Sequence, residues 1–410
     1  MRKIAQLLAA CLGLFAPYCA LAGAAPDTPP SLDTVQRRAF DFFWNETDPA
    51  TGLTKDREIN SPAPRKYRVA SIAATGYMLA ALPIAVERHW ISKAAAYKRC
   101  VTSLRFIHDR MPNVHGFYYH FVDWKTGARV WNCEISSIDT ALLAMGALTA
   151  GEYWPHTKAH RLAACLAAYM DWNWLRTNGN TIPSEPAPSM GWDPKKGFIA
   201  ARWKGYSEAA YLYLLALGTT PPYGLPRSSW NRWAFPTVVQ EGFPVFGGPS
   251  PLFMAQMTPC YYDLRGLRDR QGRDWWTAWK NAHLADQAYC ARSIGNRTYG
   301  AGFWGINASD QPGGYGADSP ADDHNTGTVS PTAMLAAMVF TPESSAKALT
   351  ALGTFRAKIW GRYGFSNAFN IDRDWYGPDV IGIDLGMMLL MTENARSGLI
   401  WRLIQHSAIA

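Results

Sequence analysis

Runs of apolar residues alternate along the chain with segments that carry their charged residues on one face. In the charged segments, apolar positions recur at the three- and four-residue spacing of an amphipathic helix. The runs between them are apolar on almost every side, so a helix formed there must be surrounded by other helices. The alternation predicts outer helices over 32–44, 92–110, 157–176, 274–293 and 342–360 and inner helices over 69–86, 136–148, 207–218, 251–267, 331–340 and 382–391.

Alternating inner and outer helices over a whole chain are typical of a closed double ring. We therefore expect an all-α fold, an (α/α)6 toroid with long aromatic loops at one rim. Strand signals are scarce: residues 117–123, with a turn at 125–127, form the main hairpin candidate, and no βαβ rhythm is present. The alternative is two helical subdomains divided within 221–251. Because no clean linker is found there, we expect a single catalytic domain over 23–410.

The N-terminus has the pattern of a targeting segment. Met1–Lys3 carries positive charge, an apolar run follows, and Ala20–Ala22 has the small-x-small pattern of a cleavage site. Pro17 and the lack of a stop-transfer flank argue against a stable membrane span. We expect residues 1–22 to be a signal peptide and the mature protein to be periplasmic or secreted. A lipid anchor at Cys11 is the alternative.

Composition describes a globular protein without a nucleic-acid partner. Hydrophobic residues make up 48% and charged residues 18%, and the net charge of +8 is not concentrated in a Lys/Arg block. Beyond residue 22 the cysteines have no CxxC spacing, which excludes a dense disulfide scaffold and favours buried thiols, with one or two bridges left open. The histidines form no dense ligand set, and the acids over 318–323 lack the EF-hand spacing. We expect a monomer without a metal or cofactor.

Four long loops, rich in aromatic residues and glycine, each lead into an inner helix and should gather at one rim. They span 176–205, 241–251, 298–330 and 361–382. Flat rings interleaved with polar side chains suit the faces and hydroxyls of sugars, although such rings also pack helix ends. The candidates for substrate contact in these loops are Trp192, Arg202, Trp203, Trp304, Asp310, Tyr315 and Trp375.

Three carboxylates open inner helices: Asp139, Glu208 and Asp384. Taken singly, such an acid caps its helix: Ser136 with Asp139 resembles a capping box, and the helix dipole favours the charge by about 0.3–1 kcal/mol. In a ring of parallel inner helices, however, the three acids would meet in one cavity. Apolar surroundings and mutual repulsion raise a carboxyl pKa while the dipole lowers it, so one acid can stay protonated beside an ionised one. Hydrolysis of a glycosidic bond requires such a pair.

Other chemistries remain as alternatives. Residues 205–209 imitate a nucleophile elbow but lack its strand and final glycine, so Ser207 fits better as a helix N-cap. A polysaccharide lyase on the same toroid would abstract a proton beside a uronate in a basic groove, for which Arg202, Lys204 and Arg373 are candidates. A non-catalytic glycan-binding protein would keep the groove without hydrolysis.

Seven sequence motifs, spread in order over nearly all of the mature chain, carry a resemblance to a known family. They are RRAFDFFW, DPATGLTKDR, EISSIDTALLAMGAL, GYSEAAYLYLLALG, GFWGINASDQPGGYGA, SPTAMLAAM and GIDLGMMLLMTEN. In these segments the chain resembles the bacterial glucoamylase-like domain family, which is similar to inverting endo-β-1,2-glucanases. The resemblance implies an exported enzyme that hydrolyses a β-glucan, β-1,2-glucan first of all, by acid/base inversion and without a cofactor.

The resemblance also implies roles for the acids. Glu208, in YSEAAYLYLLALG, matches the general acid, and Asp384, in GIDLG, matches the general base that activates water. Asp139, in SSIDTALL, matches a further acid that holds a sugar hydroxyl or tunes Glu208, and Glu134 in the same block is another candidate for substrate contact. Two more acids lie near Asp384 in the sequence and are alternatives for the base, namely Asp374 and Asp379.

Overall fold

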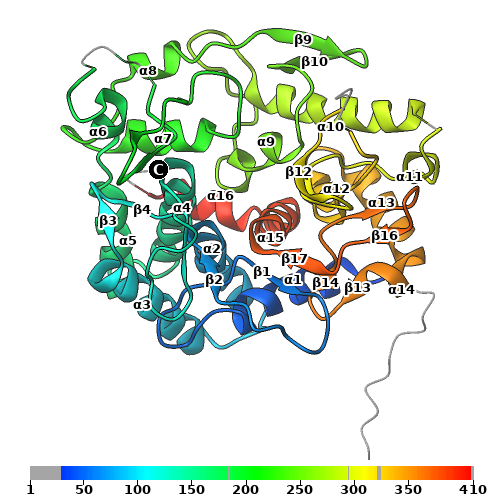
Figure 1. Cartoon of the computed structure of the whole chain (residues 1–410), viewed down its shortest axis with the longest axis horizontal. Helices are drawn as coiled ribbons and strands as arrows, with labels where there is room; N and C mark the ends of the chain where they lie inside the picture. The colour runs from blue at the N-terminus through cyan, green and yellow to red at the C-terminus, as the bar shows by residue number, and fades with distance from the viewer. Residues whose placement is uncertain (1–28, 183–184, 186, 294, 321–324, 408–410) are drawn as a thin grey trace, which may run out of the picture.

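The computed structural model describes residues 29–182, 185, 187–293, 295–320 and 325–407. The predicted signal peptide and the acids Asp322 and Asp323 lie outside these residues. Helices make up most of the secondary structure and the strands are short, which confirms the predicted helical class (Figure 1). Over the same described residues, no helix has both the length and the apolar character needed to cross a bilayer.

The apolar runs form the central helices. α15 packs against α2, α12 and η1, while α2 packs against α4 (Figure 1). The run over 251–267 forms short turns rather than one helix, because Pro259 cannot supply a helical N–H. The bounds are α2 (Ile72–Glu87), α4 (Ser137–Tyr153), α7 (Ala210–Gly218), α9 (Phe253–Gln256), η1 (Thr258–Cys260), α12 (Pro331–Ala336), η2 (Ala337–Val339) and α15 (Gly382–Ser397).

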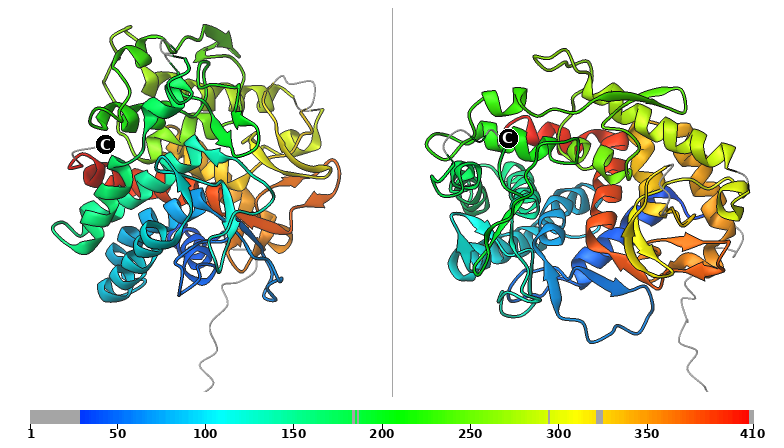
Figure 2. Two further views of the ribbon diagram at one scale, coloured as in Figure 1. Left: turned by 60° about the vertical axis from the view of Figure 1, so that its left-hand side comes forward. Right: turned by 45° about the horizontal axis from the view of Figure 1, so that its top comes forward.

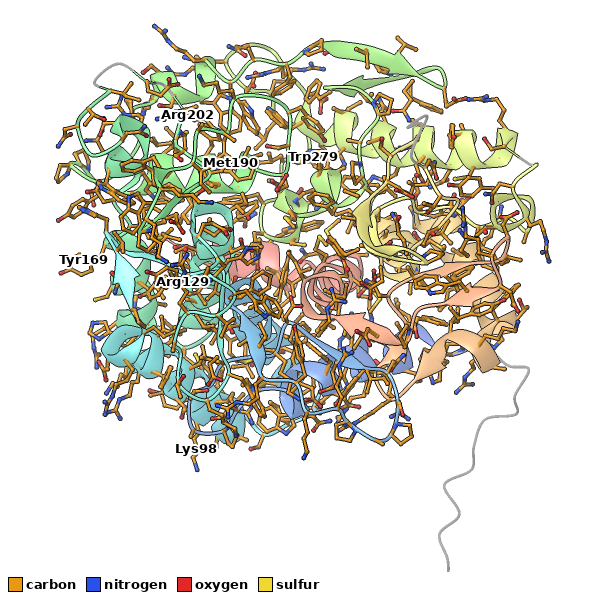
Figure 3. All side chains as sticks on the ribbon, in the orientation of Figure 1. Lys98, Arg129, Tyr169, Met190, Arg202 and Trp279 are labelled. Carbon is orange, nitrogen blue, oxygen red and sulfur yellow. The ribbon has the colours of Figure 1, made fainter. Side chains whose placement is uncertain are left out.

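The amphipathic segments form helices at the periphery, where Figure 2 shows them around the central ones. In Figure 3, Trp279 points from α10 toward the interior, where it is buried, and Lys98 points outward from α3. Two predicted helices are each divided in two, at 169–171 and at Phe355. The bounds are α1 (Leu32–Asn45), α3 (Lys93–Arg110), α5 (Lys158–Ala168), α6 (Trp172–Thr177), α8 (Ser228–Asn231), α10 (Trp275–Arg292), α11 (Arg297–Gly300), α13 (Pro342–Thr354), α14 (Arg356–Ile359) and α16 (Leu399–Ile404).

The strands form antiparallel ribbons of two or three strands in the connections between helices. The pairs are β1 (Arg57–Ile59) with β17 (Asp379–Ile381), β2 (Val69–Ser71) with β5 (Phe121–Asp123), β3 (Asn113–Val114) with β4 (Phe117–Tyr118), β9 (Thr237–Gln240) with β10 (Phe243–Phe246), β11 (Ala308–Gln311) with β12 (Gly314–Ala317), β13 (Trp360–Gly361) with β14 (Gly364–Phe365) and β15 (Phe369–Asn370) with β16 (Trp375–Tyr376). The three-stranded ribbon joins β6 (Ile135–Ser136), β7 (Gly191–Asp193) and β8 (Gly197–Phe198).

The predicted hairpin over 117–123 is only partly correct. The turn at 125–127 forms, and the Gly127 amide donates to the Asp123 carbonyl. β5, however, pairs with β2 and not with β4. This pairing matters for the site because β2 leads directly into α2, and the Ile72 amide donates to the His120 carbonyl at 3.3 Å. His120 is thereby fixed at the N-terminal end of a central helix.

α2 and α4 approach each other closely enough for their backbones to touch. A Cβ atom added to Gly146 would lie 1.9 Å from the Gly76 carbonyl oxygen, and one added to Gly76 would lie 2.4 Å from the Leu142 carbonyl oxygen. No real Cβ tolerates such distances, so both positions need glycine. This contact places the N-terminal end of α4, with Asp139, beside that of α2.

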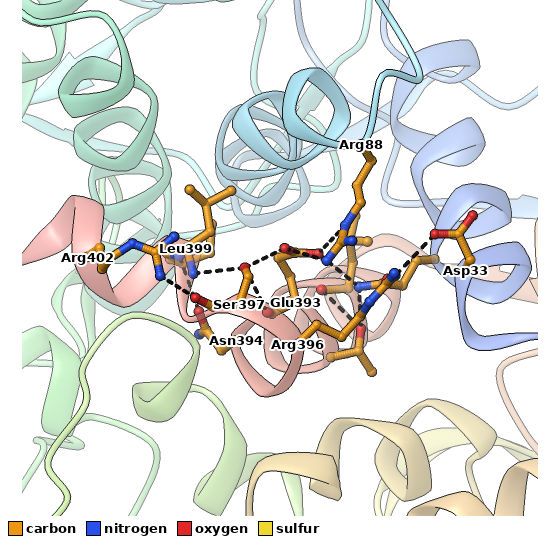
Figure 4. A network of polar contacts seen from close by, with 12 residues as sticks. Asp33, Arg88, Glu393, Asn394, Arg396, Ser397, Leu399 and Arg402 are labelled. Atoms are coloured by element: carbon orange, nitrogen blue, oxygen red, sulfur yellow. Dashed lines mark hydrogen bonds and ion pairs between the residues drawn. The ribbon is translucent and has the colours of Figure 1, made fainter.

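Ion pairs fasten the opposite ends of the central helices (Figure 4). Arg88, at the end of α2, donates from Nε to Glu393 Oε2 at 3.0 Å and from Nη2 to Oε1 at 2.9 Å. Glu393, in the last turns of α15, also accepts from Ser397 Oγ at 2.6 Å. Arg396 reaches Asp33 of α1 at 3.2 Å. The network joins α1, α2 and α15. It lies at the C-terminal ends of α2 and α15, whereas Asp384 lies in the first turn of α15.

The cysteines beyond residue 22 are all unpaired. The sequence favoured such thiols over the one or two bridges that it left open. Cys100, Cys260 and Cys290 are buried, while Cys133 and Cys165 are partly buried. Burial raises the pKa of the Cys100 thiol above its usual range, so this side chain stays protonated in the core.

Candidate active site

A cavity of about 320 Å³ lies where the N-terminal ends of the central helices meet. Asp139 of α4, Asp384 of α15 and Glu208, just before α7, all line it. Ser71, the N-cap of α2, contributes another part of the wall. The structure thus brings together three acids that are far apart in the sequence. This is the arrangement that parallel central helices were expected to produce.

Glu208 stands before its helix and not inside the first turn. α7 begins at Ala210 with Ala209 as N-cap, so the prediction of Ser207 as N-cap is wrong. A turn at 208–209 replaces the first helical residues, and Ser207 Oγ accepts only a long bond from the Ala209 amide, at 3.4 Å. Burial of the carboxyl raises the pKa of Glu208 to about 7, and the charge of Asp139 contributes in the same direction. The group can therefore hold a proton at neutral pH.

Asp384 lies in the first turn of α15 and is almost fully buried. Its Oδ2 accepts a hydrogen bond from Asn367 Nδ2 at 2.6 Å, which fixes the orientation of the carboxyl. Burial raises the pKa of Asp384 to about 7, although the Asn367 bond lowers it and the charge of Asp310 raises it further. A carboxyl with this pKa changes its charge readily near neutrality, as a proton acceptor must.

The structure separates Asp384 from the two other acids that were alternatives for the base. Asp374 is 80% exposed at its side chain and pairs with Lys358 Nζ at 3.0 Å on the surface. Asp379, in β17, is buried in ion pairs with Arg65 and Arg57. Among these three acids, Asp384 is the one that lines the cavity.

Asp139, in the first turn of α4, bonds to the N-cap residue Ser136 and faces the cavity at the same time. Ser136 Oγ accepts from the Asp139 amide at 3.2 Å and donates to Asp139 Oδ2 at 2.6 Å, which confirms the expected cap. The same Oδ2 lies 3.4 Å from His120 Nε2. The capping and site interpretations are therefore compatible, because one carboxyl group does both.

His120 is a site residue that the sequence interpretation missed. It falls within the hairpin predicted over 117–123, and it lines the cavity between two acids. Its Nδ1 lies 3.0 Å from Glu134 Oε1 and its ring stacks on Phe121 with centroids 3.9 Å apart. Burial alone would lower the pKa of His120, but Asp139 and Glu134 raise it to about 9. No spacing in the sequence signals this site, because the β2–β5 pairing creates it.

The same group is where a metal ion would find ligands among the described residues. The ligand atoms of His120, Glu134 and Asp139 lie within 4.8 Å of one another. A pKa of about 9 makes His120 an imidazolium at neutral pH, so both ring nitrogens carry protons and neither has a free lone pair. A metal would have to displace that proton and break both ion pairs. The arrangement fits the His120 imidazolium, held between the carboxylates of Glu134 and Asp139, better than a metal centre.

An arginine fastens the hairpin that forms another wall of the cavity. Arg57 of β1 donates from Nη1 to Asp310 Oδ1 at 2.9 Å and from Nε to Asp56 Oδ2 at 3.2 Å. Asp310 belongs to β11, and the hairpin β11–β12 carries Tyr315, which is 58% exposed and lines the cavity. The two predicted contact residues in this hairpin thus differ: Tyr315 faces the cavity, and Asp310 holds the hairpin in place.

Two predicted contact residues take structural roles instead. The indole Nε1 of Trp203 donates to Ser137 Oγ at 2.9 Å, and the ring is buried. Arg202, labelled in Figure 3, donates to the carbonyl of Ala187 at 2.6 Å and to that of Arg176 at 3.0 Å. These bonds occupy the guanidinium that a lyase groove would need. Backbone carbonyls in a loop that lies away from water need hydrogen-bond donors, and the Arg202 guanidinium supplies them here.

The remaining predicted contact residues also lie outside the cavity lining that the described residues form. Trp192 sits in β7 and packs against Trp174 at 6.0 Å. Trp304 is buried in the core. Trp375 belongs to β16, opposite Asn370 of β15. None of these three rings therefore lines the cavity.

Together, the fold and the site define a class: a helical protein whose central helices direct titratable carboxyls into one cavity for acid/base chemistry. The chain belongs to the glycoamylase family, whose model, described as "Putative glucoamylase", matches residues 200–408.

Solved structures and a characterised relative agree with this placement. The chain is 26% identical over 413 aligned positions to the exo beta-1,2-glucooligosaccharide sophorohydrolase (non-reducing end) of Parabacteroides distasonis; the match covers 91% of this chain but only 55% of that protein. The endo-beta-1,2-glucanase of Chitinophaga pinensis, solved with sophorotriose and glucose, superposes with a TM-score of 0.83 at 25% identity, covering 92% and 94% of the two chains. The endo-beta-1,2-glucanase of Talaromyces funiculosus, at 13% identity with coverage of 90% and 84%, shares the fold with a TM-score of 0.67.

Proposed function

We propose that this protein is a glycoside hydrolase that cleaves β-1,2-glucan with inversion of the anomeric configuration. The observation that carries the proposal is that Glu208 and Asp384 line one cavity and both have a pKa of about 7. Hydrolysis by inversion needs one carboxyl that gives a proton and another that takes one. The substrates named for the Parabacteroides and Chitinophaga relatives support the choice of linkage.

In this mechanism Glu208 is the general acid and Asp384 the general base. Glu208 gives its proton to the glycosidic oxygen as the bond from that oxygen to the anomeric carbon breaks. Asp384 takes a proton from the water whose oxygen forms the new bond to the same carbon on the opposite face. The charge of Asp139, which lies 3.4 Å from His120, raises the pKa of Glu208 and so favours the protonated acid.

The proposal includes an architecture and a location for the enzyme. The central and peripheral helices would close into an (α/α)6 toroid, with the substrate entering from the side on which the central helices begin. The N-terminal segment would direct a monomeric enzyme to the periplasm or outside the cell, where a glucan polymer is accessible. Export is supported by the charge and apolar pattern of residues 1–22.

One experiment tests the proposed activity. The purified protein is incubated with linear and cyclic glucans of several linkages, and the released sugars and their anomeric form are followed by NMR. We expect reducing ends from β-1,2-glucan, first seen as the α-anomer, and no release by Glu208→Gln. Unsaturated products that absorb in the ultraviolet would identify a lyase. Binding without release of reducing ends would identify a glycan-binding protein.

A further inference from the structure

Trp131 combines a large apolar side chain with a high exposure. The residue is 62% exposed, while most tryptophans of the described part are buried or partly buried. A single exposed apolar residue needs no explanation by itself. The position of Trp131 is unusual for two further reasons, its backbone conformation and its neighbours.

The backbone of Trp131 is in the left-handed region, which bulky residues rarely adopt. Trp131 has φ +54° and Asn132 has φ +50°, and the Cys133 amide donates to the Val130 carbonyl at 3.2 Å. Two central residues with positive φ and this bond define a type I′ turn. Glycine, asparagine and aspartate dominate such turns. Asn132 fits this preference, and a tryptophan at the first central position does not, which indicates a function for the ring.

Arg129 holds this turn in place. Its Nε donates to the Cys133 carbonyl at 2.5 Å, and its Nη2 donates to the Asn132 carbonyl at 2.6 Å and to Asp193 Oδ2 at 2.7 Å. Figure 3 shows Arg129 inside the outline of the molecule, and Tyr169 at its edge. These charged bonds tie the turn to β7 and hold its strained conformation in place.

The indole stands beside the cavity that holds the acids. Its ring centroid lies 5.1 Å from that of Phe121, with the planes at 61°. Phe121 lines the cavity and stacks on His120. Glu134, which pairs with His120, follows the turn directly. Only the ring of Phe121 therefore separates the exposed indole of Trp131 from the cavity.

We infer that Trp131 is a sugar-binding platform outside the cavity, which holds a part of the glucan chain remote from the bond that is cleaved. This inference rests on the proposed function and assigns an outer binding position to it. An exposed indole face offers the apolar surface on which the C–H face of a sugar ring stacks. The rigid turn keeps the ring oriented before the substrate binds, so little conformational entropy is lost on binding.

The test uses two substitutions at Trp131 and one control. Trp131→Asn suits the type I′ turn and removes the ring, whereas Trp131→Phe keeps an aromatic face. Steady-state kinetics are measured on long β-1,2-glucan and on the shortest oligosaccharide that is cleaved. We expect Trp131→Asn to raise KM for the long chain roughly three- to tenfold with kcat unchanged, and to leave the short substrate unaffected. Trp131→Phe should be closer to the wild type, and Tyr169→Ala should have no effect.

Thermal unfolding separates binding from folding. The midpoint of Trp131→Asn should equal or exceed that of the wild type, because asparagine relieves the backbone strain. An unchanged KM for long chains in Trp131→Asn would overturn the inference. A binding titration with β-1,2-glucan, followed by tryptophan fluorescence, distinguishes a failure of this inference from a failure of the proposed function. It is made on the wild type and on Trp131→Asn. Binding that depends on Trp131, without release of sugar, would support the platform and contradict the hydrolase.

Discussion

At the scale of single residues, burial decides the behaviour of Glu208 and Asp384. It raises the pKa of each carboxyl to about 7, by more than two pH units over an ordinary acid. Near neutrality each acid is therefore protonated in part of the molecules and ionised in the rest. In the mechanism that we propose, the reactive form has the proton on Glu208 and the charge on Asp384.

Activity should depend on pH as a bell-shaped curve. Below pH about 7 the pKa of Asp384 causes loss of the ionised base, and above pH about 7 the pKa of Glu208 causes loss of the protonated acid. We expect kcat/KM on β-1,2-glucan to peak close to neutrality. The measurement is kcat/KM at intervals between about pH 5 and 9. A rate that keeps rising toward acidic pH would contradict these assignments.

Glu208→Gln should lose activity and gain stability at alkaline pH. We expect a loss of about 10²–10⁴-fold in kcat with the fold intact, because the change is nearly isosteric. The pKa of Glu208 rises from 4.5 in the unfolded chain to about 7 in the fold, so the folded state binds more protons between these values. Stability of the wild type then falls as pH rises through this window, and glutamine removes that loss.

The check for Glu208→Gln is the thermal midpoint of both proteins at about pH 5 and pH 8. The variant should be the more stable protein at the higher pH only. A variant that keeps most of its activity would exclude Glu208 as the acid.

His120→Gln should destabilise the protein in acid and neutral solution. The pKa of His120 rises from 6.5 to about 9 in the fold, so its ion pairs contribute fully below pH 6.5 and are lost as pH rises through about 9. The variant should therefore unfold at a lower temperature than the wild type at about pH 6 and at nearly the same temperature at about pH 10. Equal destabilisation at both values would show that His120 acts by packing alone.

At the scale of elements, the contact of α2 with α4 sets the geometry of the site. Gly76 and Gly146 let the two backbones touch, and the N-terminal ends of both helices then meet at the cavity. Larger residues would push the helices apart and move Asp139 away from its partners. Glycines at these two positions therefore allow the close packing of α2 and α4 and also set the position of Asp139.

Gly146→Ala should destabilise the protein strongly. The new Cβ would overlap the Gly76 carbonyl at 1.9 Å, and overpacking of a core commonly costs about 1–3 kcal/mol, with more where backbone must shift. The free energy of unfolding in urea measures the effect. Gly205→Ala is the matched control, because a Cβ atom added at Gly205 would have no neighbouring atom within 4 Å. A similar loss for both variants would contradict the close-contact explanation.

At the scale of the whole molecule, the central helices have two different ends. The N-terminal ends surround the cavity with acids, and the C-terminal side of α2 and α15 is joined by the Arg88–Glu393 pair (Figure 4). The carboxyls of the cavity and this ion pair thus lie at opposite ends of the same helices. Mutations at the two ends should be separable in their effects.

Glu393→Ala should lower stability without altering the site. It leaves the partly buried Arg88 without its partner, and breaking a buried ion pair typically costs about 3–5 kcal/mol. We expect a lower thermal midpoint and an unchanged kcat/KM for the folded protein. Asp374→Ala, which removes the exposed pair with Lys358, should leave the midpoint unchanged. A loss of kcat/KM in Glu393→Ala at low temperature would show that the two ends are coupled.

Much of the fold could be predicted from the sequence because helix formation leaves a local pattern. The apolar runs that became α2, α4 and α15 had no polar face to expose, so only the interior of the molecule suited them. Breaks such as the one before α6 were missed, because Asp171 caps that helix through its side chain within an otherwise helical pattern.

The sequence alone determined most of the buried helices and the acids at their starts, because both follow from neighbouring residues and the helical period. The segment 251–267 was the exception. Tertiary structure decided which acids meet. It placed Asp384 in the cavity and Asp379 in an ion pair, brought His120 between two carboxylates, and gave Trp203 and Arg202 structural roles. These outcomes depend on groups far apart in the chain, because burial and charge act on a side chain through space.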